Sequence, residues 1–160
     1  MAGHPPRFIT PEGFARVRAE YEELFGNERP KLVETISWAA ANGDRSENGD
    51  YIYGRKRLRE VDRRLSHLSR IMKAAKIIDP AKQVTDQVRF GATVELADED
   101  GNRRILTIVG DDEANASVGR IGWSAPLARA LIGARVGAAR IVQLPAGEKS
   151  YEVVAICYPD

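Results

Sequence analysis

A nine-residue stretch in the N-terminal half of the chain combines side chains that could bind a metal ion. It reads Gly-Asp-Arg-Ser-Glu-Asn-Gly-Asp-Tyr and spans residues 43–51. Asp44, Glu47 and Asp50 place three carboxylates within seven residues, and Arg45 is the only basic residue among them. Mg²⁺ prefers oxygen ligands, and one or two carboxylates can complete a site whose other ligands come from another molecule.

The same acidic residues also have a purely structural explanation. Asp44 and Glu47 have the spacing of a capping box, and Ser46 is another candidate cap for a helix that follows. Acidic side chains are favourable at the positive end of a helix dipole. Capping accounts for one or two of these residues but does not require the whole cluster. The residues alone therefore leave capping and metal binding both open.

A long helical pattern precedes this stretch. Thr10, Pro11 and Glu12 form a helix start, with a capping threonine followed by a proline at the first helical position. Apolar residues then recur at steps of three and four, and the pattern resumes displaced by one position after Pro30, where we expect a kink or an unwound turn. The residues of this seam are Phe14, Val17, Tyr21, Leu24, Leu32, Ile36 and Ala39. The first helical arm is predicted from about Pro11 to Ala40.

The second arm has an unbroken heptad pattern that ends before Pro80. Its seam residues are Tyr51, Gly54, Leu58, Val61, Leu65, Leu68, Met72 and Ala75. Only ten residues connect the two arms, so an antiparallel hairpin with residues 43–51 at its tip is expected.

The charge of the two arms supports this pairing. Residues 11–50 contain nine acidic and five basic residues, whereas residues 51–76 contain nine basic and two acidic ones. Oppositely charged arms attract each other across the flanks of a seam. The basic excess of the second arm is more than pairing requires. It is either a solvated face or a strip that guides a phosphate backbone or an acidic surface.

Beyond Pro80 the pattern changes to an apolar period of two, which is typical of β-strands. Four strands and one short helix are predicted, at residues 92–96, 104–109, 139–144 and 151–156 and at 126–132. Asp111, Asp112 and Glu113 could suggest a divalent cation site, but they lack the spaced ligands and glycine of a calcium loop, so a solvated turn is favoured. Cys157, the only cysteine, is interpreted as a small apolar filler of the last strand. We expect residues 1–9 to be a loosely held tail.

These patterns predict an α+β protein with two domains. Residues 1–80 form the antiparallel coiled-coil hairpin with its acidic tip, and residues 81–160 form an antiparallel β domain with one short helix. The sequence contains neither a membrane-length apolar run nor an apolar core of a secretory signal, so a cytoplasmic protein is expected. It also has no Ser/His/Asp set, P-loop or dinucleotide-binding glycine motif, which argues against an independent enzyme.

The tip motif and the basic run 56–64 closely resemble the Gre transcript-cleavage factors of bacterial RNA polymerase. Arg45 and the basic run favour the GreB branch. Further matching segments are Trp38-Ala39-Ala40, Pro126-Leu127-Ala128-Arg129-Ala130-Leu131 and Pro145-Ala146-Gly147-Glu148. The resemblance covers almost the whole chain. It implies an FKBP-like fold for the C-terminal domain, which would dock at the rim of the polymerase secondary channel while the hairpin enters it.

The resemblance also implies roles for individual residues. Asp44 and Glu47 would hold a second Mg²⁺ that is shared with the polymerase, and the polymerase would cleave backtracked nascent RNA. Arg45 and Ser46 would orient the tip. The basic face, formed by Arg55, Lys56 and Arg59, would contact the extruded RNA. Ser124 and Pro126 would take part in polymerase docking, and the factor is expected to act as a monomer away from any membrane.

Two residues depart from the family pattern. Gly49 stands where the family usually has alanine, which weakens the first helical turn by about 1 kcal/mol. Ser124-Ala125 precedes Pro126 where the family commonly has serine directly before proline, so an altered docking contact is expected there. Two alternatives to a cleavage factor also remain: a channel regulator that does not promote cleavage, and a prolyl isomerase with a coiled-coil arm. The isomerase would need an aromatic pocket built from Phe90, Trp123, Tyr151 and Tyr158.

Overall fold

A computed structural model describes residues 7–43, 47–83 and 85–159, and its contacts divide the chain into two compact units. One unit is Ala15–Ala74, and the other joins the residues up to Phe14 to those from Ala75 onward. The predicted α+β class is confirmed, with a helical hairpin and a mixed sheet that carries a short helix. The predicted division at residue 80 placed the N-terminal residues with the hairpin. In the structure, the residues up to Phe14 group with the second unit instead.

The first arm of the hairpin is one continuous run of helix with a π-helical turn inside it. Helix α1 (Pro11–Glu23) passes through the π-helical turn Leu24–Glu28 into α2 (Arg29–Ala41). Within this turn the Arg29 N–H bonds to the carbonyl of Leu24, five residues earlier. A π-helical turn adds one residue to the helix, which explains why the apolar seam is displaced by one position. The irregularity expected at Pro30 is therefore a π-helical turn just before the proline, and the arm continues without a break.

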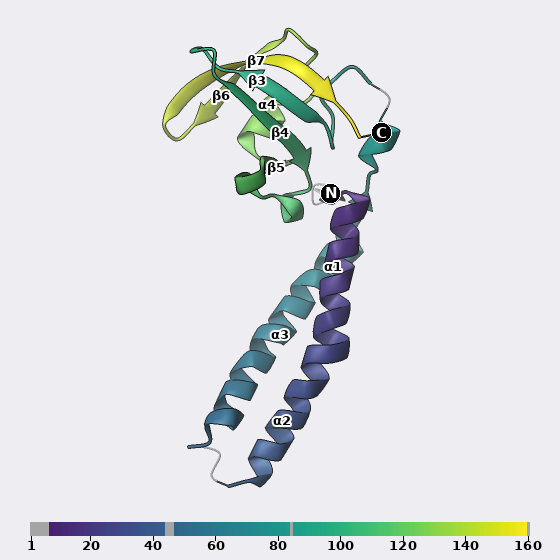
Figure 1. Ribbon diagram of the computed structural model, residues 1–160, viewed down its shortest axis with the longest axis vertical. Coiled ribbons are helices and arrows are strands. Elements are labelled where there is room, and N and C mark those ends of the chain that lie inside the picture. Colours follow the sequence, from purple (N-terminus) through teal and green to yellow (C-terminus); the bar gives the residue numbers. More distant parts are fainter. Residues whose placement is uncertain (1–6, 44–46, 84, 160) are drawn as a thin grey trace, which may run out of the picture. The chain divides into compact units, whose positions relative to one another are not determined.

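The second arm, α3 (Gly49–Ala74), runs alongside the first (Figure 1). A small apolar cluster joins the two arms, and it consists of Leu24, Val61, Leu65 and Leu68, with Val17, Tyr21 and Leu32 at its edge. The predicted seam is confirmed over most of its length. Its last position is wrong, because the helix ends at Ala74 and Ala75 begins a strand.

Ion pairs between the arms flank this narrow seam. The guanidinium of Arg57 binds Glu28 through two hydrogen bonds, of 2.5 and 3.1 Å, and Nη2 of Arg64 donates to Glu20 at 2.8 Å. Arg29 donates to Asp62 at 2.8 Å. The hydrogen bonds from the arginines hold the pKa values of Glu20 and Glu28 below their ordinary range. The predicted attraction between the oppositely charged arms thus consists of individual ion pairs.

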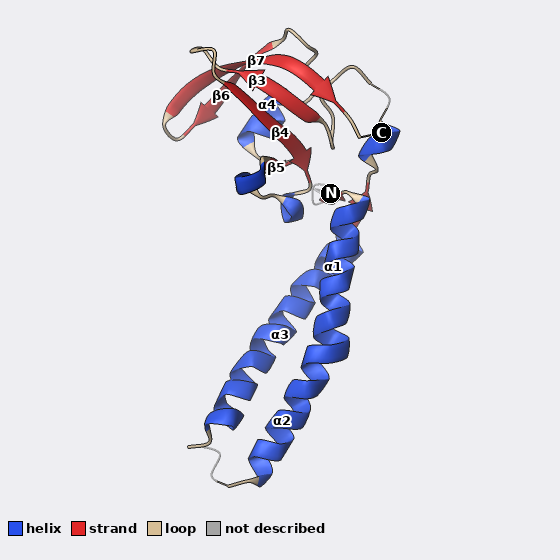
Figure 2. Ribbon diagram, in the orientation of Figure 1, coloured by secondary structure: helices blue, strands red, loops and turns tan. Residues whose placement is uncertain are grey.

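The second unit contains a five-stranded sheet of order β5-β4-β3-β7-β6 (Figure 2). Its strands are β3 (Thr93–Ala97), β4 (Arg103–Val109), β5 (Arg120–Gly122), β6 (Ala139–Leu144) and β7 (Gly147–Cys157). Neighbouring strands are antiparallel except β4 and β5, which are parallel. The sequence did not predict β5, because three residues are too few to show a period of two.

Helix α4 (Pro126–Leu131) packs on one face of this sheet and completes a continuous core. Fully buried side chains from the strands and the helix form it, among them Val94, Leu96, Leu106, Ile108, Leu131, Val142 and Val153. Cys157, expected to fill this core, is exposed instead. It lies opposite Thr93 in β7, and the alternation of the strand places Cys157 with Ala155 on the exposed face while Ile156 packs against the core.

The segment before α1 is not a loose tail over the residues that the structure describes. Strand β1 (Arg7–Ile9) pairs in parallel with β2 (Ala75–Ile77), and Ile9 is fully buried. The expectation for residues 7–9 is therefore wrong, while residues 1–6 lie outside the described part of the chain. Such short strands are set by tertiary contacts that local sequence patterns do not reveal.

Helix α1 starts as predicted, with Thr10 as its cap. The Thr10 hydroxyl accepts a hydrogen bond from the Gly13 N–H at 3.0 Å. The Thr10 N–H, in turn, donates to the Glu113 carboxylate at 3.0 Å, and so does the Thr10 hydroxyl. Glu113 thus takes the role of the glutamate at the third helical position of a capping box. This requires glycine at position 13, since a Cβ there would overlap the Glu113 side chain.

Candidate functional site

The hairpin tip is bounded by well-defined helix ends. The Asn42 N–H closes α2 on the carbonyl of Ala39 at 3.1 Å, and the next residue, Gly43, has a φ of +134°. That backbone conformation strongly favours glycine, so Gly43 lets the chain leave the helix. Asp44, Arg45 and Ser46 lie outside the described residues, and their predicted roles stay predictions. Glu47 is in a turn directly before α3, and its side chain is exposed.

The residue that caps α3 is Asn48, not Glu47. Its Oδ1 accepts from the Tyr51 N–H at 3.1 Å, and α3 begins at Gly49. Glu47 therefore precedes the cap and is not part of the helix start. Capping, the structural explanation considered for the acidic cluster, does not account for Glu47. Sequence reasoning overlooked Asn48, although asparagine is among the most favoured N-cap residues and this one lies two residues before Asp50.

Close packing near the tip brings the two arms together at Gly54. A Cβ at this position would lie 2.8 Å from Cγ1 of Ile36 in the other arm. Gly54 is buried within α3, so the absence of a side chain allows the arms to approach at this level. The tip thus rests on two closely packed helices.

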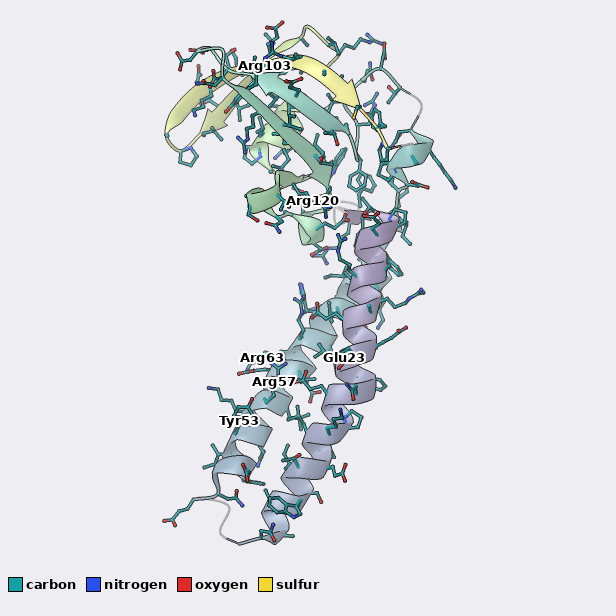
Figure 3. All side chains as sticks on the ribbon, viewed as in Figure 1. Glu23, Tyr53, Arg57, Arg63, Arg103 and Arg120 are labelled. Carbon is teal, nitrogen blue, oxygen red and sulfur yellow. The ribbon has the colours of Figure 1, made fainter. Side chains whose placement is uncertain are left out.

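The basic residues of α3 divide into two sets. Arg57 and Arg64 face the first arm and bind its glutamates. Lys56, Arg59 and Arg63 are exposed, and within the described part of the chain they form no ion pair. Figure 3 shows Arg57 and Arg63 on this helix, with Tyr53 nearer the tip. Arg55 is also exposed; it donates to the Tyr51 hydroxyl at 3.0 Å and lies 5.7 Å from the centre of that ring.

The spacing of the second set gives α3 an outward basic stripe. Together with Arg70 its members recur at steps of three, four and seven residues, which is one face of a helix. They are Lys56, Arg59, Arg63 and Arg70, all exposed. The predicted basic face shares Lys56 and Arg59 with this stripe. The ion pairs between the arms use Arg29, Arg57 and Arg64, so Lys56 and Arg59 are not needed to pair the arms.

The predicted docking residues lie where α4 begins. The N–H and hydroxyl of Ser124 donate to the two carboxylate oxygens of Asp111, at 2.9 and 2.6 Å. Pro126 occupies the first turn of α4. Trp123, Ser124, Arg129 and Ile132 line an open hollow of about 550 Å³. Asp111, which sequence reasoning assigned to a solvated turn, therefore holds the backbone of the proposed docking segment.

The other two acids of that turn are also engaged, so the expectation of a solvated turn is wrong. Asp112 forms an ion pair with Arg7 at 2.8 Å and is largely buried, while Glu113 binds Thr10. Each carboxylate thus has a separate partner. Among the residues that the structure describes, no group of three or more histidine, cysteine or acidic side chains could hold a metal ion.

The aromatic residues needed for an isomerase pocket are largely taken up by packing. The ring of Trp123 contacts those of Phe8 and Phe90 edge to face, with centres 5.0 and 5.9 Å apart, and Phe90 is only 2% exposed. Tyr151 is buried in the core of the sheet. The structure gives no support to the isomerase alternative.

Two family models match almost the whole chain. The model for the N-terminal domain of the GreA and GreB transcription elongation factors matches residues 7–77, and the model for their C-terminal domain matches residues 82–158. The chain belongs to the GreA/GreB family of transcription elongation factors. The family that the tip motif predicted is thereby confirmed.

Two relatives named GreB agree with this assignment, and a solved structure of a GreA homolog is also similar to the chain. The transcription elongation factor GreB of Neisseria meningitidis serogroup B is 43% identical over 159 residues, covering 99% of this chain and 98% of the relative. GreB of Pseudomonas aeruginosa is 46% identical over 160 residues, covering 97% and 95%. The crystal structure of GreA factor homolog 1 from Thermus thermophilus aligns over 96% of this chain and 99% of that one, at 22% identity and a TM-score of 0.45. Relatives named GreB are consistent with the predicted branch.

No helix within the part of the chain that the structure describes is both long enough and apolar enough to span a membrane.

Proposed function

We propose that this protein enters the secondary channel of bacterial RNA polymerase in the cytoplasm and stimulates hydrolytic cleavage of backtracked RNA. The observation that carries the proposal is the position of Glu47. Its carboxylate is exposed in the turn between the arms, and Asn48 rather than Glu47 caps the helix that follows. An exposed carboxylate at the bend of a helical hairpin, which does not cap α3, is suited to serve in another protein's active site.

The chain acts through positioning rather than through chemistry of its own. Glu47, together with Asp44, would supply hard oxygen ligands, which fits Mg²⁺ because this ion is commonly bound by one or two carboxylates plus groups from its surroundings. When bound, the ion supplies the positive charge that activates a water and steadies the leaving oxygen. The catalytic residues of the polymerase hold the first ion. This chain is thus a cofactor of the polymerase and not an enzyme.

The outward basic stripe of α3 provides the second part of the proposal. Lys56 and Arg59 are exposed and free of pairing with the first arm, so they can neutralise the phosphates of extruded RNA. Arg55 lies beside them, one turn beyond the tip. We assign these three residues to the path of the RNA 3′ segment, and Arg45 and Ser46 to orienting the tip.

Docking is assigned to the segment that contains Ser124 and Pro126. Asp111 fixes this segment by accepting both hydrogen bonds from Ser124, so the departure from the family pattern at Ser124-Ala125 leaves an ordered loop. Asp111→Ala should weaken polymerase binding several-fold without changing the rate at saturating factor. Asp100→Ala, which removes an exposed carboxylate from the β3–β4 turn, is the matched control.

A cleavage assay on halted elongation complexes tests the function. Complexes with end-labelled RNA are incubated with polymerase alone, with the wild-type protein, and with Asp44→Ala/Glu47→Ala. We expect the wild type to shorten the RNA and the double variant to bind the polymerase but to leave the RNA intact. Equal cleavage by both proteins would reject the role of the carboxylates. Binding without cleavage by the wild type would instead identify a regulator that occupies the channel.

A further inference from the structure

The side chain of Asn48 joins the ends of the two arms at the tip. Its Nδ2 donates to the carbonyl oxygen of Ala39 in α2 at 2.8 Å. Its Oδ1 accepts from the N–H of Tyr51 in α3 at 3.1 Å, and its backbone carbonyl accepts from the N–H of Ile52 at 3.0 Å. One residue thus makes hydrogen bonds to both helices.

These bonds satisfy backbone groups that helix ends leave without a partner. The last carbonyls of a helix and the first N–H groups of the next have no partner within their own helix. Asn48 serves one group of each kind, which an asparagine can do because its amide contains a donor and an acceptor. Serine or aspartate could still accept from Tyr51. Neither has the amide N–H that reaches Ala39.

Few other contacts hold the arms together at this level. The apolar cluster of the hairpin includes no residue between Ile36 and Gly54. Within that stretch, Ala39 is the only buried side chain among the residues that the structure describes. Between Ile36 and the bend, the described contacts that hold the arms together are the Gly54 contact, the packing of the fully buried Ala39 and the Asn48 bridge.

We propose that Asn48 is a positioning residue that ties the end of α2 to the start of α3 and fixes the backbone from which Glu47 projects. Glu47 directly precedes Asn48, so the anchored Asn48 backbone determines where the glutamate begins. The bridge also holds Ala39, three residues before Asn42, where the loop leaves α2. This inference rests on the proposed function, because it concerns how the tip carboxylates are presented. Small displacements of catalytic groups cost rate rather than binding.

The test separates maximal rate from affinity. Asn48→Ser keeps an oxygen that can cap α3 but removes the bridge to Ala39. At saturating factor we expect RNA cleavage in halted complexes to fall about tenfold or more. The concentration of factor giving half-maximal cleavage should stay within about twofold of the wild-type value, because the docking segment is unchanged. Asn27→Ser is the matched control; it removes an exposed bond to Glu23 within the same hairpin and should leave both quantities unchanged.

Three results decide the proposal. A wild-type maximal rate for Asn48→Ser would overturn it, as would a loss that higher factor concentration fully restores. If far-ultraviolet circular dichroism shows that Asn48→Ser has lost helix, Asn48→Asp replaces it, because a carboxylate caps well at the positive end of a helix. The same two outcomes then apply. If Asp44→Ala/Glu47→Ala loses cleavage while the Asn48 variants cleave at the wild-type rate, only this inference is rejected. If Asp44→Ala/Glu47→Ala cleaves normally, the proposed function is rejected.

Discussion

The hairpin and the sheet unit are stabilised in different ways. The sheet unit has a continuous core in which strands and α4 bury many side chains completely. The hairpin has a cluster of four buried residues, flanked by ion pairs whose side chains are 31–48% exposed. Exposed ion pairs contribute little stability, whereas buried apolar groups contribute much. Apolar burial therefore contributes more stability to the sheet unit than to the hairpin, which exposes most of its side chains along its length.

The largest effect that this comparison predicts is on core leucines. Leu96→Ala in β3 should lower the free energy of unfolding of the sheet unit by about 2–5 kcal/mol, because Leu96 is fully buried. Leu65→Ala in the hairpin should cost less, at the lower end of that range, because its site is 8% exposed and borders solvent.

The two units can be followed separately in urea. In a Trp38→Phe background, the remaining tryptophan, Trp123, reports on the sheet unit by fluorescence, while circular dichroism at 222 nm reports mainly on the helices. A larger loss from Leu65→Ala than from Leu96→Ala would contradict the comparison.

Two glycines of α3 provide a sharper test of the hairpin near its tip. Gly54→Ala should destabilise the helices by about 1 kcal/mol, since overpacking against Ile36 outweighs the gain in helix propensity. Gly49→Ala is the matched control, because nothing lies within 4 Å of the added Cβ. It should stabilise the helix by up to about 1 kcal/mol. Thermal unfolding followed by circular dichroism measures both, and equal shifts in the same direction would show that the close approach at Gly54 has no energetic effect.

The ion pairs between the arms should have the smallest effect. Arg64 and Arg57 lower the pKa values of Glu20 and Glu28, so these pairs stabilise the fold above about pH 4.3, the ordinary pKa of glutamate. This stability is lost as the pH falls through the lowered pKa values of the folded protein. Each pair should contribute only a few tenths of a kcal/mol, because the groups are well exposed to solvent.

Glu20→Gln/Glu28→Gln isolates this contribution. The wild type should be slightly more stable than the variant at pH 7, and the difference should be smaller at pH 3, because the pairs are lost as the glutamates become protonated. Unfolding midpoints in urea at the two pH values provide the measurement. A difference of the same size at both pH values would assign the effect to packing of the glutamate side chains.

The hairpin was largely predictable because its pattern is long and regular. The heptads of α3 predicted both the helix and most of the residues in contact, and the one-position displacement in the first arm marked the π-helical turn. Local periodicity could not reveal β1, β2 or β5, because strands of three residues form only through distant partners. The heptad pattern predicted the end of α3 less well than its interior, because Ala75 fits the pattern but begins a strand.

The candidate site was predicted at the level of its motif but not of its contacts. Residue types and spacing singled out Asp44 and Glu47 as candidates, whereas their metal role and the roles of Arg55, Lys56 and Arg59 follow from the family resemblance and stay predictions. The cap at Asn48 could have been found from its residue type, but its bond to Ala39 depends on how the arms meet. The same holds for Asp111, whose partner Ser124 is thirteen residues away.

The most direct test of the account is the dependence of RNA cleavage on Mg²⁺ concentration with wild-type protein and with Glu47→Gln, each at saturating factor. Glutamine keeps the size of the side chain but lacks the negative charge that favours Mg²⁺. The account predicts that Glu47→Gln binds the polymerase as tightly as the wild type but requires more Mg²⁺ and cleaves at least about tenfold more slowly at each concentration. Superimposable Mg²⁺ curves for the two proteins would contradict it.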